Sequence, residues 1–380
     1  MKSEPLTTHV FGLFWLALAC CLMLGCSSQA IVSCESTAGI TVICGFKNPE
    51  DIKRLPDQKT LLISQVGTLG APIPGSLVFF DTLSQRISPA FPVDASALDL
   101  KPDNWGASHC PGMPGPEFSP LGIAVRQRDD GRWQVAAVNY GQRMSVEMFE
   151  LLMTVDHQYR LAWRGCVIPP DEVSINSVAL LGNGGFVASH MFDRRAPEIF
   201  GVSSSVWRAQ LGLDTGYVFE WLPAAEGVFR VLEGSHGPFL NGIEVSRDEN
   251  TVFVSVTSAD QIRKIDRRSG RQLAVLKVER PDNISWDDDG FLLVASLTGS
   301  RLENLACIKR IGENCGLAFS IVRIYPSNMS AQQIFKHEGA PMGAATGAQQ
   351  LGTSLYLGSF AGDRIVKIPY ASAPKRGIDE

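Results

Sequence analysis

The fold is decided by residues 241–255, NGIEVSRDENTVFVS. An apolar strand, a polar turn at 247–250 and a second apolar strand ending in a small residue are typical of a β-hairpin. A similar stretch follows at once, from Asp282-Asn283-Ile284 to the apolar run 291–296. Two matching hairpins so close together indicate an internal repeat.

The same unit recurs along the whole chain. It begins with a polar pair and an aliphatic residue in its clearest copies, and the heads of all its copies are Glu50, Leu121, Asn176, Asn241, Asp282 and Thr346. Further strand-like segments, such as 261–266 and 321–325, lie between the hairpins. Two hairpins per repeat predict a four-stranded blade, and the repeat number predicts a six-bladed β-propeller. Two separate β-sandwiches are the alternative, but matching hairpins favour one closed array.

Composition agrees with an all-β fold. The 380 residues include 36 Gly and 22 Pro, 19% are charged, 45% are hydrophobic, and the net charge is −5. This balance excludes a disordered chain and gives no basic surface for a nucleic acid. We expect a signal peptide at 1–25, an N-terminal tether at 26–45, a propeller at 46–370 and a C-terminal tail at 371–380.

The N-terminal region is typical of an export signal. Residues 10–24 are apolar and uncharged, which is shorter than the ~20 residues of a comfortable membrane span. The following Gly25-Cys26 resembles the lipobox of bacterial lipoproteins, in which the Cys becomes the lipidated first residue. Cys20 is a second candidate, and a cleaved signal without lipid or an uncleaved anchor is the alternative. We expect a lipoprotein anchored through Cys26, facing the periplasm or the cell exterior.

The cysteines beyond the signal suit an oxidising compartment. They are Cys34, Cys44, Cys110, Cys166, Cys307 and Cys315. An even number in an exported chain indicates disulfides rather than thiol chemistry. Cys34–Cys44 and Cys307–Cys315 would each close a short loop, which leaves Cys110–Cys166, although fifteen pairings are formally possible.

The repeat heads predict a metal site. Equivalent positions of successive blades converge at the propeller axis, and four heads there carry side-chain carboxyl or carboxamide oxygens: Glu50, Asn176, Asn241 and Asp282, with Asn283 beside the last. A set of oxygen ligands at flexible geometry favours Ca²⁺ over Mg²⁺. Asn and Asp also cap turns before strands. Their recurrence at one register in four repeats favours the metal.

These segments also resemble those of the paraoxonase (arylesterase) family, within the wider group of SMP-30 gluconolactonases and strictosidine synthases. The matching segments are Pro49-Glu50-Asp51-Ile52, Ile175-Asn176-Ser177, Leu240-Asn241-Gly242-Ile243 and Pro281-Asp282-Asn283-Ile284-Ser285. The resemblance runs in order from about 46 to 370. It implies a six-bladed propeller with a catalytic calcium held by Glu50, Asn176, Asn241, Asp282 and Asn283.

The chain departs from the paraoxonase pattern at three positions. Leu121 and Tyr140 stand where paraoxonases carry a His pair, the proposed base and its support. The resemblance implies a second, structural calcium at Asp51, but Ser177 replaces that ion's other Asp. The departures point to the SMP-30 side of the group, where an Asp near the metal serves as base. Asp282 is therefore the expected catalytic residue.

The sequence as a whole predicts a calcium-dependent hydrolase of a lactone or ester. No Gly-x-Ser-x-Gly elbow suggests a serine nucleophile. Substrate contacts are expected from Tyr140, His236 and Phe239. His190 is expected at the far end of its strand from Asn176, in a surface or blade-packing role. The alternative is a non-catalytic, lipid-anchored binding propeller with a structural calcium. A carbon–carbon bond former has no feature in its favour.

Overall fold

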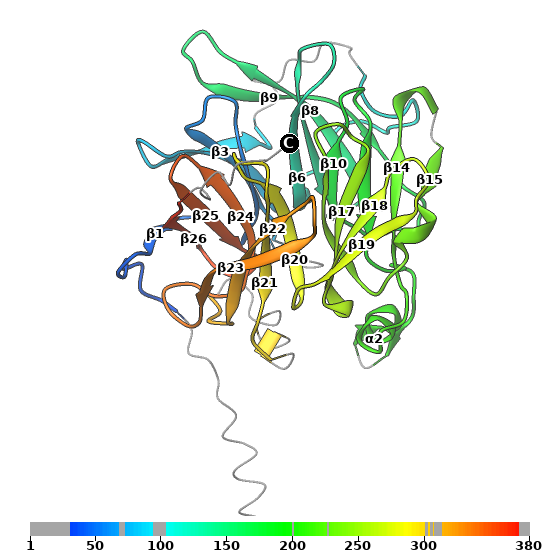
Figure 1. Cartoon of the computed structure of the whole chain (residues 1–380). Helices are drawn as coiled ribbons and strands as arrows, with labels where there is room; N and C mark the ends of the chain where they lie inside the picture. Colours follow the sequence, from blue (N-terminus) through cyan, green and yellow to red (C-terminus); the bar gives the residue numbers. More distant parts are fainter. Residues whose placement is uncertain are drawn as a thin grey trace, which may run out of the picture.

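The computed structural model describes residues 31–67, 73–93, 104–199, 201–225, 228–300, 303–304, 307 and 314–371. Over these residues the chain forms six four-stranded antiparallel sheets, arranged as the blades of a propeller (Figure 1). The predicted six-bladed β-propeller is thereby confirmed. The strand β8 spans Ser145–Met153.

Each blade begins at the propeller axis and continues outward along the chain. The first three blades are β2 (Pro49–Arg54), β3 (Thr60–Gln65), β4 (Ser76–Asp81) and β5 (Arg86–Phe91); β6 (Pro120–Gln127), β7 (Trp133–Asn139), β8 and β9 (Tyr159–Val167); and β10 (Ile175–Leu180), β11 (Phe186–His190), β14 (Tyr217–Trp221) and β15 (Phe229–Val231). The long connection from β11 to β14 holds β12 (Glu198–Ile199), β13 (Val202–Ser203) and the helix α2 (Ser204–Gln210).

The last three blades follow the same order. They are β16 (Leu240–Val245), β17 (Thr251–Val256), β18 (Gln261–Asp266) and β19 (Gln272–Lys277); β20 (Pro281–Trp286), β21 (Leu292–Leu297), β22 (Phe319–Tyr325) and β23 (Ser330–His337); and β24 (Ala345–Leu351), β25 (Ser354–Ser359), β26 (Arg364–Pro369) and β1 (Thr41–Cys44). The short turns η2 (Pro223–Ala225), η3 (Glu233–Ser235) and η4 (Thr257–Ala259) are 3₁₀ helices.

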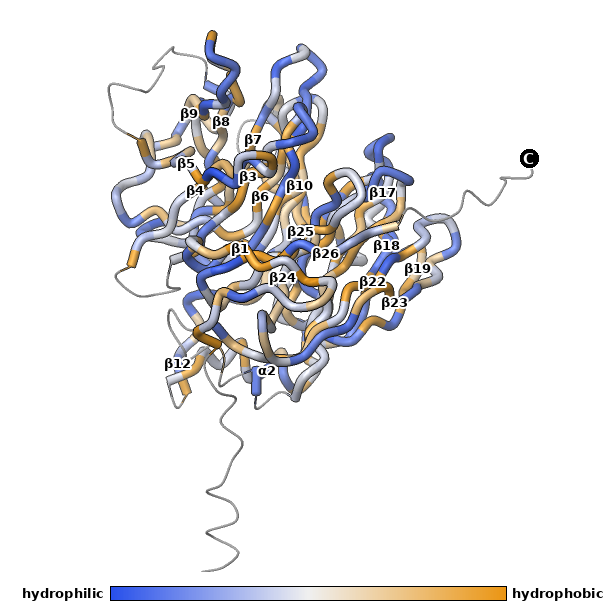
Figure 2. Tube along the Cα trace, turned by 90° about the vertical axis from the view of Figure 1, so that its left-hand side faces the viewer, coloured by the Kyte–Doolittle hydropathy of each residue, from blue (hydrophilic) through white to orange (hydrophobic). Residues whose placement is uncertain are grey.

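Closure of the ring explains the long apolar runs in the sequence. Each inner strand contacts the next, from β2 through β6, β10, β16, β20 and β24 back to β2. Every residue of β3, β21 and β25 is buried, because neighbouring blades cover both faces. The outer strand β19 is mostly exposed or half-buried. Figure 2 shows hydrophobic residues along the strands and hydrophilic residues in many of the turns.

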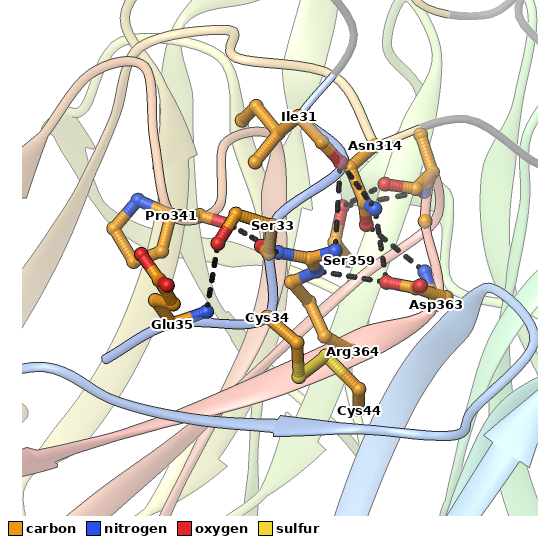
Figure 3. A network of polar contacts seen from close by, with 12 residues as sticks. Ile31, Ser33, Cys34, Glu35, Cys44, Asn314, Pro341, Ser359, Asp363 and Arg364 are labelled. Carbon is orange, nitrogen blue, oxygen red and sulfur yellow. Dashed lines mark hydrogen bonds and ion pairs between the residues drawn. A yellow bond between two sulfur atoms is a disulfide. The ribbon is translucent and has the colours of Figure 1, made fainter. Parts of the chain in front are cut away.

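The last blade is completed by the other end of the chain. Residues 41–44, placed in the tether by the sequence, form β1 and pair antiparallel with 364–367 of β26. Figure 3 shows how the preceding segment is fixed: Arg364 donates to the carbonyl oxygens of Ser33 and Pro341 and pairs with Asp363. The propeller boundary therefore lies before residue 41.

Arg364 should matter for this closure, because its side chain is 1% exposed and its partners include buried carbonyl groups. We expect Arg364→Met to lower the free energy of unfolding by about 2–3 kcal/mol, since donors to these oxygens are lost. Denaturant unfolding measures the change, and the exposed Arg247→Met is the control. An unchanged midpoint for Arg364→Met would contradict this role.

The described cysteines form three disulfides, Cys34–Cys44, Cys110–Cys166 and Cys307–Cys315, as expected: two close short loops, and the third joins the remaining pair. Within the described residues, the structure contains no helix that is both long and apolar enough to cross a membrane. Cys26 and the expected signal peptide lie outside the described residues.

Candidate metal centre

Each inner strand is irregular at its beginning. The six predicted heads are the second residues of β2, β6, β10, β16, β20 and β24. Immediately after the first residue the pairing with the second strand shifts register in every blade, for example between Pro281 and Ile284. Such a bulge re-aims side chains out of the strand alternation. It lets the consecutive residues Asp282 and Asn283 both take part in one site.

The structure brings four of the five expected ligands into direct or near contact. The Asn283 amide nitrogen donates to Glu50 Oε1 at 2.8 Å, across the ring closure. A side-chain hydrogen bond links Asn241 with Asp282, and the Asp282 carboxylate acts electrostatically on Glu50. Asn176 holds the equivalent position in β10, which contacts the Asn241 strand β16. All five side chains belong to residues only 3–8% exposed.

The oxygens of this set are short of donors. Among the described residues, no hydrogen-bond partner reaches Glu50 Oε2, Asn176 Oδ1, Asn241 Oδ1 or Asn283 Oδ1, and all four atoms are buried. A buried polar atom without a partner costs about 1–3 kcal/mol, so proteins rarely leave several together. A hard cation uses such lone pairs as ligands. This set of buried oxygens therefore fits Ca²⁺ as its ligands.

The electrostatics point the same way. Burial, together with the carboxylates of Asp51 and Asp282, raises the pKa of Glu50 well above its ordinary value. Burial also raises the pKa of Asp282 to about 8. With a pKa of about 8, the Asp282 carboxyl group needs a nearby cation to be fully ionised at neutral pH. Within the described ranges, no three His, Cys, Asp or Glu side chains could hold a metal by themselves, so the amide oxygens are essential to a site here.

Hydroxyl groups of the blades hold the ligand backbone in place. Ser189 donates to the Asn241 carbonyl of the next blade, and Ser255 donates to the Asp282 carbonyl at 2.6 Å. Thr346 donates to the Glu50 carbonyl at 2.7 Å. The repeat signalled these serines only as small residues ending the second strand. Their role in joining adjacent blades could not be read from the sequence.

Gly242 also allows the blades to approach closely. A Cβ at this position would lie 2.5 Å from the Asp282 carbonyl oxygen and 2.6 Å from Asn283 Cα. Any side chain there would displace Asp282 and Asn283, the two candidate ligand residues of the next blade.

The expected substrate contacts lie at the beginnings of the inner strands, on the ligand side. Phe239 precedes Asn241, has a left-handed backbone with φ of 56°, and stacks on Phe192 at 5.7 Å between ring centroids. Such a conformation is strained for an aromatic residue and is often kept at functional sites. Tyr140 hydrogen-bonds through its hydroxyl to Ser174 Oγ at 3.1 Å. His236 is exposed, with its ring 5.5 Å from that of Tyr217.

The expected place of His190 was wrong. The hairpin brings the end of β11 back to the start of β10, so His190 pairs with Ile175, directly beside Asn176. The imidazole is buried, its Nδ1 lies 3.0 Å from the Ser174 backbone nitrogen, and burial lowers its pKa. Antiparallel pairing, which a linear reading of one strand ignored, explains the difference.

Leu121 offers no chemistry at the second head. It is 4% exposed and packs in the hydrophobic core between the second and third blades. Asp51 is also buried, but its carboxylate oxygens already have partners: Lys53 and the backbone N–H groups of Ile52 and Ile123.

A cavity of about 320 Å³ opens at the opposite ends of the same inner strands. Its lining includes Lys53, Arg126, Glu244 and Trp286, all near the strand ends. This cavity is larger than anything needed for an ion, but none of the five expected ligands lines it. The unsatisfied oxygens, and not the cavity, identify the candidate site.

No protein-family model matches this sequence, and no curated protein sequence matches it. Among solved structures, the chain resembles a Bacteroides thetaiotaomicron protein of unknown function, with a TM-score of 0.52, 10% identity and coverage of 90% of this chain and 75% of that one. A luciferin-regenerating enzyme has a TM-score of 0.50 and 10% identity, covering 89% and 97%. A gluconolactonase from Xanthomonas campestris has a TM-score of 0.49 and 15% identity, covering 91% and 96%. These likenesses concern the fold.

Proposed function

We propose that this chain is a calcium-dependent hydrolase of a lactone or ester, of the lactonase or arylesterase type. The observation that carries the proposal is the group of buried oxygens, at one end of the inner strands, that find no hydrogen-bond partner among the described residues. Glu50, Asn176, Asn241, Asp282 and Asn283 would hold the ion. The sequence resemblance to the paraoxonase and gluconolactonase group supports the same ligand set.

The chemistry divides between the ion and the chain. Calcium, when bound, supplies a Lewis acid that polarises a carbonyl oxygen, an effect worth several kcal/mol. Asp282 accepts the proton of the attacking water and returns it to the leaving oxygen as the ester bond breaks. Burial raises the pKa of Asp282 to about 8, which makes the ionised carboxylate a better proton acceptor, and the side chain of Asn241 partly opposes that rise. Phe192 and Phe239 form an aromatic wall suited to the apolar part of a substrate.

A non-catalytic binding propeller with a structural calcium is the second candidate. Leu121 lies in the core and the Tyr140 hydroxyl is bound to Ser174, so neither supplies the base of a paraoxonase. In this alternative the ion has only a structural role and stabilises the packing of the inner strands.

We also propose that the chain is exported and anchored to a membrane by lipid on Cys26. The support is the apolar run before Gly25-Cys26 and the three disulfides between described cysteines, which suit an oxidising compartment. The proposed substrate is a small molecule, and the acidic net charge of −5 gives no reason to expect a nucleic-acid partner.

A panel of lactones and aryl esters tests the hydrolase proposal. We expect at least one substrate to turn over, with activity lost after chelation and restored by added calcium, because the Asp282 carboxyl group needs the cation to be fully ionised at neutral pH. The restored sample is the control for irreversible damage. A panel without turnover, combined with a melting temperature that falls on chelation, would favour the binding propeller instead.

A further inference from the structure

A lysine side chain lies among the inner strands, in the lining of the same cavity. Lys53 lies in β2 and is only 9% exposed. Its ammonium group faces oxygen atoms from three blades. Nζ is 3.3 Å from Asp51 Oδ1, 3.8 Å from Glu244 Oε1 and 3.5 Å from the carbonyl oxygen of Ile284. Burial alone would lower the pKa of Lys53, but Asp51 and Glu244 together raise it above its ordinary value. The lysine therefore stays charged.

The carboxylate of Asp51 is fully supplied with donors. Oδ1 accepts from the Ile52 backbone at 2.8 Å and faces Lys53, and Oδ2 accepts from the Ile123 backbone of the next blade at 2.9 Å. Glu50, its neighbour in sequence, has one buried oxygen with no partner among the described residues. The two adjacent carboxylates therefore differ: Asp51 is paired with the Lys53 ammonium group, whereas Glu50 has an oxygen that could bind a metal ion.

We infer that the Lys53 ammonium is a built-in second cation of the channel, so that the chain binds one divalent ion and not two. The ion would sit with Glu50 and Asp282, while Lys53 neutralises Asp51 and part of the charge of Glu244. A divalent ion between Asp51 and Glu244 would meet the ammonium at contact distance and be repelled. This inference rests on the metal site of the proposed function.

Metal analysis of the full-length protein equilibrated with calcium tests the inference. We expect one bound calcium per chain in the natural protein and in Lys53→Arg, which keeps the charge. Lys53→Met should bind two, because Asp51 and Glu244 lose their cation and the Ile284 carbonyl remains as a ligand. Lys264→Met is the matched control, since Lys264 lies in β18, away from the inner strands, and donates to the Pro326 carbonyl at 2.8 Å. This variant should bind one calcium ion.

Two further results separate the possible failures. A natural protein with two ions, or a folded Lys53→Met that still binds one, would overturn the inference. A natural protein with none would instead remove the metal site of the proposed function. If Lys53→Met does not fold, the double variant Asp51→Asn/Lys53→Met removes both charges together. One ion in that variant supports the inference, and two would contradict it, because, of the pair Asp51 and Glu244, only Glu244 would remain charged to hold a second ion.

Discussion

Replacement of Asp282 by Ala is expected to lower kcat/KM by about 10³-fold or more, the largest effect of any single change in the chain. The side chain is 6% exposed and lies next to both Asn241 and Glu50, so the variant loses a ligand and the proposed base together. A positioned general base alone contributes about 10²–10⁴-fold. Hydrolysis rates and calcium affinity, measured on the same samples, check the expectation.

Asp282→Asn separates the two roles. The amide keeps an oxygen for the ion but cannot accept a proton from water, so we expect calcium to bind more weakly and turnover to be almost lost even at saturating calcium. Asp156→Ala, an exposed aspartate in the turn between β8 and β9, is the control and should be unchanged. If Asp282→Ala and Asn241→Ala both hydrolyse the substrate normally, the hydrolase proposal is wrong.

The repeat pattern predicted much of this molecule because each repeat is a local unit. A hairpin needs only apolar strands and a polar turn, and both are visible within a short window. The six heads occupy the second residue of each inner strand because one local pattern produces one local geometry. The ligand candidates Glu50, Asn241 and Asp282 could therefore be found by register alone.

The parts that the sequence missed depend on contacts between distant segments. β1 pairs with β26 across nearly the whole chain, and no local signal in residues 41–44 specifies that partner. Lys53 looks like an ordinary charged residue of a hairpin strand until ring closure brings Glu244 and Ile284 beside it. The position of His190 beside Asn176 follows from the antiparallel pairing of β11 with β10. Closure therefore determines which polar residues face the channel.

The gain in stability from calcium is expected to increase with pH. With no metal ion in the channel, the pKa of Asp282 in the folded chain is about 8, against an ordinary value of 3.8. Burial raises the pKa of Glu50 in the same direction. Between these limits the folded chain keeps protons that the unfolded chain has released. The contribution of these two carboxyl groups to the stability of the calcium-free protein is therefore largest at low pH and is lost as pH rises toward 8.

Calcium reverses this trend, because the ion binds the ionised carboxylates and displaces their protons. Each proton displaced adds up to ~1.4 kcal/mol of calcium-dependent stability per pH unit in the window. Melting temperatures of metal-stripped protein, with and without added calcium and without chelator, should therefore diverge between about pH 5 and 8. Asp282→Asn should flatten the divergence, since its amide does not titrate. An equal calcium shift at both ends of the window would show that the buried carboxyl groups are already ionised without the ion. The raised pKa values would then not describe the channel, and the unsatisfied oxygens alone would have to account for calcium affinity.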